Sequence, residues 1–177
     1  MSEKGLLNNY LTMSIRFITV KNKNQIFRLA KLAKEIWEEY YQTIITQEQI
    51  HYMIDTFQSL EAIKNQIQEG MQYYLAVSGE DEIGYLAYAA EKDCSLFLSK
   101  IYIKRDFRNR GKGREMFAII LAQAQKQKLK TVRLTVNKNN SASVEKYLKM
   151  GFSITDSVVK DIGNGFYMDD YVMAYKV

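Results

Sequence analysis

The chain has 177 residues, of which 47% are hydrophobic and 25% are charged. A chain of this length and composition can bury the core of one domain, which excludes a disordered protein. No apolar run reaches the ~18 residues that a membrane-spanning helix needs, and the N-terminus lacks the long apolar segment of a signal peptide.

We therefore expect a single soluble, cytoplasmic domain over residues 1–177, with residues 1–12 as a candidate disordered extension because Met13 would serve as a start. Cys94 is the only cysteine, which excludes an internal disulfide and favours a reducing compartment. His51 is the only histidine, so a zinc site built on several His or Cys ligands is excluded. We expect no metal.

The first part of the chain predicts one strand followed by three helices. Polar and apolar residues alternate in the strand, and the helices show helical apolar spacing and residues that favour caps. The predicted elements are a strand over Ser14–Val20, a helix capped at Asn24, a helix from Thr46 to Phe57, and a helix between Ser59 and Gly70.

The rest of the chain is richer in strands. The predicted elements are strands over Gln72–Ser78, Glu82–Glu91 and Ser95–Ile103, a helix from about Gly113 to Gln127, a strand over Thr131–Val136, a helix from Asn140 to Lys149, and strands over Phe152–Ile162 and Phe166–Val177. The turn Gly163-Asn164-Gly165 joins the last two strands. This order predicts an α/β fold with one mixed sheet.

The excess of basic residues lies in one short segment. Seven bases and one acid, Asp106, occur between positions 100 and 114. The bases are Lys100, Lys104, Arg105, Arg108, Arg110, Lys112 and Arg114. Because the remainder of the chain is close to neutral, this segment favours a compact polyanionic ligand over a long nucleic-acid track.

The basic segment contains a glycine-bearing loop between a strand and a helix. The strand over Ser95–Ile103 runs into a loop that carries Arg108, Gly111 and Gly113, and the helix follows at once. This arrangement directs several backbone N–H groups and the positive end of the helix dipole at one point. The loop therefore predicts an anion site, with phosphate as the preferred anion.

Two common phosphate motifs do not fit this loop. A P-loop needs glycine at position 106 and Ser or Thr after the lysine, but Asp106 and Gly113 stand there. A dinucleotide fingerprint needs a third glycine where Met116 lies.

Two motifs resemble those of a known family. The loop Arg108-x-x-Gly111-x-Gly113 resembles motif A of the GNAT superfamily of N-acetyltransferases. The downstream N-N-S-A-S-V-E-K-Y-L-K-M-G-F resembles the superfamily signature Asn-x-x-Ala-x-x-x-Tyr-x-x-x-Gly-Phe, with Ser143 in place of the alanine. Together the two motifs cover about Ser95–Phe152. The resemblance implies a GNAT-like α/β (α+β) fold, with one central mixed, mostly antiparallel sheet of about seven strands flanked by helices.

The resemblance also implies the reaction. An N-acetyltransferase of this kind uses acetyl-CoA as co-substrate and no metal, and it transfers the acetyl group to a primary amine by direct attack in a ternary complex. Loose similarity to bacterial polyamine acetyltransferases makes a small cationic amine the first expectation for the acceptor, with a protein or peptide amine second. We expect no nucleic acid and no membrane as partner, and a homodimer stays open.

The resemblance assigns roles to residues in both motifs. The loop would hold the diphosphate of CoA, the strand main chain would pair with the pantetheine arm and stabilise the oxyanion, and a tyrosine would protonate the leaving thiolate. The implied cofactor-binding residues are Ile101, Tyr102, Ile103, Arg108, Asn109, Arg110, Gly111, Lys112, Gly113, Arg114 and Asn140. The implied acid is Tyr147.

The sequence does not decide which group is the general base. Many relatives place a glutamate on the fourth strand, yet Ser95–Arg105 contains no acid, and Ser99 lies where that carboxylate would be. An amine of pKa ~10 must lose a proton before it attacks. A water chain could carry this proton, and the candidate bases elsewhere are Glu38, Glu39, His51, Asp169 and Asp170. The missing acid also leaves a non-catalytic CoA-sensing module as an alternative, with a nucleic-acid-binding protein as a third reading.

Overall fold

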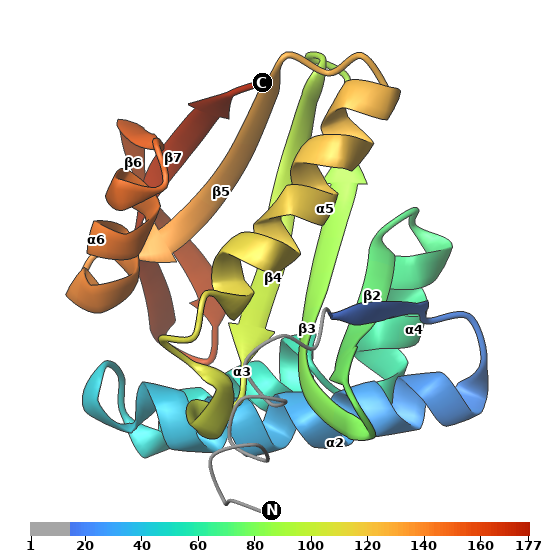
Figure 1. The fold of residues 1–177 in the computed structure, drawn as a ribbon. Coiled ribbons are helices and arrows are strands. Elements are labelled where there is room, and N and C mark those ends of the chain that lie inside the picture. The colour runs from blue at the N-terminus through green and yellow to red at the C-terminus, as the bar shows by residue number, and fades with distance from the viewer. Residues whose placement is uncertain (1–14) are drawn as a thin grey trace, which may run out of the picture.

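The structure is a computed structural model that describes residues 15–177. The extension that the sequence predicted over residues 1–12 lies outside the described residues, and so does Ser14. The described chain forms a seven-stranded sheet in the order β1-β2-β3-β4-β5-β7-β6 with helices packed against it (Figure 1). The predicted mixed, mostly antiparallel sheet flanked by helices is confirmed.

The elements follow the predicted order along the chain. Their bounds are β1 Arg16–Thr19, α2 Lys23–Tyr40, the 3-10 turn η1 Tyr41–Thr43, α3 Gln47–Phe57, α4 Leu60–Gln68, β2 Gln72–Ser78, β3 Asp81–Ala90, β4 Ser95–Ile103, the 3-10 turn η2 Arg105–Phe107, α5 Lys112–Lys126, β5 Thr131–Asn137, α6 Ser141–Lys149, β6 Ser153–Gly163 and β7 Phe166–Lys176. Among these residues, no helix is both long enough and apolar enough to cross a membrane.

The cap of α2 differs from the prediction. Asn22, not Asn24, precedes the helix, and its side chain accepts a hydrogen bond from the Gln25 N–H at 3.0 Å. The Gln25 side chain in turn accepts from the Asn22 N–H at 3.1 Å. This reciprocal capping box satisfies two N–H groups that the first turn leaves without helical partners.

Alternation along the central strand β3 directs side chains to two cores on opposite faces of the sheet. Leu86 belongs to the core beneath α5, together with Met116 of that helix. Its neighbour Tyr85 belongs to the core beneath α2 and α4, which includes Leu29 and Ile63. The two layers hold the sheet rigidly between them, so the strand ends form a fixed platform.

The sheet opens in its centre, between β4 and β5. These two strands are parallel and pair only over Ser95–Phe97 and Thr131–Arg133. Beyond that short contact β4 stays paired with β3 as far as Ile103, whereas β5 continues along β7. Among residues 15–177, the edge of β4 that faces β5 thus has no strand partner over its second half.

A β-bulge in β4 lies at the position where the two strands part. Lys100 pairs with Ala87 and Leu98 pairs with Tyr88, so Ser99 is the extra residue. A bulge bends its strand and changes the direction in which the following side chains point. It therefore helps to open the sheet and sets the orientation of Lys100.

Candidate active site

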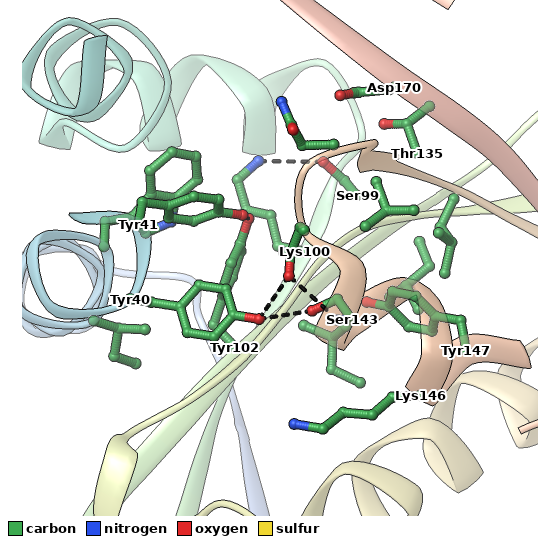
Figure 2. A pocket seen from close by; sticks show the side chains of 18 of the residues that line it. Tyr40, Tyr41, Ser99, Lys100, Tyr102, Thr135, Ser143, Lys146, Tyr147 and Asp170 are labelled. Atoms are coloured by element: carbon green, nitrogen blue, oxygen red, sulfur yellow. Dashed lines mark hydrogen bonds between the residues drawn. The ribbon is translucent and has the colours of Figure 1, made fainter. Parts of the chain in front are cut away.

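A cavity of about 930 Å³ occupies the gap between β4 and β5. Its walls come from the second half of β4, from β5, β6 and β7, from the first turn of α5, from α3, α4 and α6, and from the C-terminal end of α2. Figure 2 shows the side chains of some of the residues that line it. The predicted site residues that line this cavity are Ile101, Tyr102, Ile103, Arg108, Asn109, Gly111, Gly113, Arg114, Asn140 and Tyr147, whereas Arg110 and Lys112 do not.

The first turn of α5 faces one end of the cavity. Gly111 is the N-cap residue and has φ +76°, a left-handed conformation that favours glycine. Its carbonyl accepts hydrogen bonds from the N–H groups of Arg114 and Glu115, at 3.0 and 3.2 Å. In the described part of the chain, the N–H groups of Arg110 and Gly113 have no acceptor. N–H groups left free at a helix N-terminus favour an anion, and binding of an anion here stays a prediction.

Arg108 lines the cavity and is held in place by several protein groups. Its Nε donates to the Ile103 carbonyl at 2.8 Å, and its two terminal nitrogens donate to the carboxylate of Glu39. The guanidinium also lies 4.8 Å from the centre of the Tyr40 ring. Arg108 therefore joins the end of β4 to helix α2, and its charge is matched by Glu39.

Two of the other basic side chains near the loop are also paired. Lys104 lies 3.1 Å from Glu35, and Lys112 lies 3.0 Å from Glu115. Arg114 makes no ion pair among residues 15–177, and it lines the cavity. It is the cation best placed to meet an anion at the first turn of α5.

Tyr147 projects from α6 into the cavity. Its ring packs against Phe152, with ring centres 5.5 Å apart, and in Figure 2 it lies beside Ser143. Among residues 15–177 its hydroxyl has no hydrogen-bond partner. Burial raises the pKa of the phenol above its ordinary value, so the group stays protonated at neutral pH and is able to donate a proton.

Asn140 caps α6 as the sequence predicted, and its side chain also connects α6 to α2. The side chain is 5% exposed, and its Oδ1 accepts from the Ser143 N–H at 3.2 Å and from the Tyr40 hydroxyl at 2.9 Å. The Tyr40 hydroxyl also lies 2.8 Å from the Ser143 hydroxyl. Serine at the alanine position of the signature thus completes a network between α2 and α6. Nothing in the sequence pattern singled out Tyr40.

Asp170 is the only candidate base that lines the cavity. It lies on β7 opposite Asn137, at the end of β5, and it is 7% exposed. Burial raises the pKa of its carboxyl group, against a hydrogen bond from Thr135 that lowers it. The other candidates lie elsewhere: Glu38 beside Lys34, Glu39 on Arg108, Asp169 beside Lys138, and His51 on the exposed side of α3.

Lys100 is a buried lysine in the cavity wall that the sequence interpretation missed, because it was counted with the cationic loop. It is 7% exposed, and its Nζ donates to Gln66 Oε1 at 2.9 Å and to the Ser99 hydroxyl at 3.2 Å. The ammonium lies 5.2 Å from the centre of the Tyr73 ring. Burial lowers the pKa of Lys100 to about 8.

Aromatic side chains form the wall of the cavity beneath α2. The rings of Trp37 and Tyr41 have centres 4.4 Å apart, and those of Trp37 and Tyr102 are 5.6 Å apart. The Tyr41 and Tyr102 hydroxyls lie 3.1 Å from each other. This wall is rigid and largely apolar, so it can exclude water from a reaction in the cavity.

The structure thus has a sheet that opens between two parallel strands, with a helix N-terminus facing the opening. Residues 41–169 match the family described as acetyltransferase (GNAT) domain. Because this match spans well over half of the chain, the protein belongs to the GNAT family and is an acetyltransferase.

Solved structures show the same fold. The PaiA N-acetyltransferase of Thermoplasma acidophilum in complex with coenzyme A has a TM-score of 0.78 at 22% identity, with 93% of this chain and 100% of that chain covered. A GNAT acetyltransferase of Elizabethkingia anophelis with acetyl-CoA bound has a TM-score of 0.63 at 16% identity, covering 93% and 99%. The ribosomal-protein-alanine N-acetyltransferase of Brucella melitensis has a TM-score of 0.62 at 18% identity, covering 92% and 99%. The search of curated proteins found no match.

Proposed function

We propose that the protein transfers the acetyl group of acetyl-CoA to a primary amine, by direct attack of the amine in a ternary complex. The observation that carries this proposal is the gap between β4 and β5, which joins the first turn of α5 to a buried carboxylate in one continuous cavity. Two structures of the same fold hold coenzyme A or acetyl-CoA, which supports the choice of donor.

The N–H groups at the start of α5 are suited to the diphosphate of CoA, with Arg114 adding a positive charge. The free edge of β4 over Ile101–Ile103 can pair with the peptide-like pantetheine arm in the manner of an added strand. A main-chain N–H in the same stretch would stabilise the oxyanion that forms on the thioester carbonyl. The side chain of Tyr102 contributes to the aromatic wall, so its proposed role toward CoA is through its main chain.

The acid and the base both come from the β5 side of the gap, Tyr147 from α6 and Asp170 from β7. Asp170 takes the proton of the acceptor ammonium, and its raised pKa makes it a stronger base than an exposed aspartate. The nitrogen attacks the carbonyl carbon, the new C–N bond forms, and the C–S bond breaks. Tyr147, which stays protonated at neutral pH, donates its proton to the sulfur as the C–S bond breaks, so that CoA leaves as the thiol.

A thiol-release assay with acetyl-CoA tests the proposal across amines, amino acids, aminoglycosides and peptides. We expect release that depends on the acceptor, together with binding of acetyl-CoA by calorimetry. Binding without release for every acceptor would instead indicate a CoA-sensing module. Failure to bind acetyl-CoA at all would refute the proposal.

A further inference from the structure

Two opposite charges are buried in the walls of the cavity without pairing with each other. Lys100 comes from β4 and Asp170 from β7, and each is 7% exposed. Lys100 donates only to the neutral oxygens of Gln66 and Ser99. Among residues 15–177, neither Lys100 nor Asp170 makes an ion pair. The other candidate bases on α2 and β7, which are Glu38, Glu39 and Asp169, are each paired with a basic side chain.

A buried charge without a counter-ion is costly, because the protein interior replaces its hydration poorly. A lysine that has room to reach water normally extends its ammonium into it. Lys100 does not, since its ammonium is held by Gln66 and lies over the Tyr73 ring. The cation is thus kept inside the cavity, and no carboxylate of residues 15–177 forms an ion pair with it.

In the view of Figure 2, the two charged side chains lie in the same part of the cavity. In the view of Figure 2, the Ser99 hydroxyl lies between the Lys100 ammonium, to which it is hydrogen-bonded, and the Asp170 carboxylate. The bulge at Ser99 sets this arrangement, because it inserts one residue between Leu98 and Lys100 in the register with β3. The cavity therefore offers a cation and an anion to the same occupant.

We infer that the acceptor is a free amino acid, whose carboxylate binds Lys100 and Gln66 while its ammonium faces Asp170. This inference rests on the proposed function, in which Asp170 is the base. An amino acid carries the complement of both buried charges at a short separation, and charge-assisted hydrogen bonds of this kind are about twice as strong as neutral ones. The Gln66 amide nitrogen donates to the Phe57 carbonyl at 3.1 Å, and its second N–H adds a neutral donor for the same carboxylate.

The same charges disfavour the small polyamine that the sequence resemblance suggested first. A second ammonium group would meet the Lys100 ammonium, and like charges close together in a site of low polarity repel each other. A peptide would separate its two charged ends by more than an amino acid does. The experiment therefore tests a polyamine and a peptide as acceptors beside the amino acids.

The experiment compares matched acceptors in the thiol-release assay with the full-length protein. Leucine, phenylalanine and lysine are each measured beside their own C-terminal amides, and spermidine and a tripeptide complete the panel. We expect kcat/KM for at least one amino acid to exceed that for its amide by about tenfold or more, since the amide lacks the group that would pair with the buried cation.

Variants separate a carboxylate site from a merely structural lysine. In Lys100→Met the acid-to-amide ratio of kcat/KM should fall by about tenfold, whereas Lys100→Arg, which keeps the charge, should retain a preference for the acid. Lys104→Met is the matched control, because that lysine follows the same strand but pairs with Glu35 outside the cavity. The acid-to-amide ratio of kcat/KM for Lys104→Met should equal that of the wild type.

Amides or spermidine that react as well as the amino acids, or a ratio that Lys100→Met does not change, would overturn the inference. Calorimetry of the same acceptors with the CoA-loaded protein gives a readout that does not need turnover. Heat with an amino acid but not with its amide would support the carboxylate site even if transfer were absent. Heat with neither would refute it, whether or not the protein transfers acetyl groups to other amines.

Discussion

Replacement of Lys100 by methionine should stabilise the folded protein at neutral pH, although it removes a group that we place in the acceptor site. Burial lowers the pKa of the ammonium to about 8 from 10.5 in water. At about 1.4 kcal/mol for each pKa unit, this difference means that the buried charge costs about 3 kcal/mol of folding free energy. Loss of the two Lys100 hydrogen bonds would reduce this gain by about 1 kcal/mol. The reduction is small because Gln66 keeps its hydrogen bond from Tyr73.

The net expectation for Lys100→Met is thus a gain of about 2 kcal/mol at pH 7, or roughly 4–8 °C in Tm for a domain of this size. Methionine matches the length and apolar stem of lysine, so we expect little change in packing. The gain should depend on pH. Since the folded protein releases the Lys100 proton at lower pH than the unfolded chain, the wild type recovers stability as pH rises from about 8 toward 10.5.

Urea unfolding at pH 7 and at pH 10, followed by circular dichroism, measures both effects. The advantage of Lys100→Met over the wild type should be largest at pH 7 and should shrink at pH 10. Lys104→Met serves as the control, since that lysine is ion-paired and partly exposed. A Lys100→Met protein that is less stable than the wild type at pH 7 would show that the ammonium has a compensating partner, and the reasoning would fail.

Three further predictions concern the proposed chemistry. Tyr147→Phe should lower kcat by about 100-fold, the usual contribution of a general acid, while the Kd for acetyl-CoA stays unchanged; equal kcat would remove Tyr147 as the acid. Asp170→Asn should lower kcat/KM by a similar ~100-fold and abolish the acidic limb of the pH profile, a limb that the raised pKa of Asp170 places above the usual aspartate range. Gly111→Ala should weaken acetyl-CoA binding by about tenfold or more by calorimetry, because a methyl group there enters open space beside the proposed diphosphate site. Gly165→Ala is its control, since φ is +77° at Gly165 and +76° at Gly111 and neither position has a neighbour within 4 Å of an added methyl group. Both variants should therefore lose similar stability. Equal affinity of the two variants for acetyl-CoA would contradict the proposed diphosphate site.

Local chemistry explains which parts of the fold the sequence could predict. The Asn164-Gly165 turn between β6 and β7 has positive φ at both residues, 54° and 77°, as a tight hairpin needs. The cap of α2 was misplaced because Asn22 and Asn24 are equally good caps by residue type. The deciding feature is Gln25, three residues after Asn22, since only that pair can form the reciprocal capping box.

The acceptor end of the site could not be predicted in the same way. Asp170 reaches the cavity through the long-range register that pairs it with Asn137 of β5. Lys100 reaches it through a bulge, and an inserted residue cannot be recognised from strand alternation alone. The α5 end was predictable because its loop and helix are adjacent in sequence, whereas the pairing of Arg108 with Glu39 joins residues far apart in the chain.

The absence of a strand-four acid and the presence of Lys100 have one physical explanation. A carboxylate at position 99 would lie next to the Lys100 ammonium, which is already 3.2 Å from the Ser99 hydroxyl, and the two charges would neutralise each other. With the carboxylate on β7 instead, both charges remain available to the acceptor. A cation near the acceptor nitrogen also disfavours its ammonium form, so Lys100 would help Asp170 to remove the proton. In this arrangement Lys100, which binds the acceptor carboxylate, and Asp170, which takes the proton, both promote deprotonation of the acceptor amine.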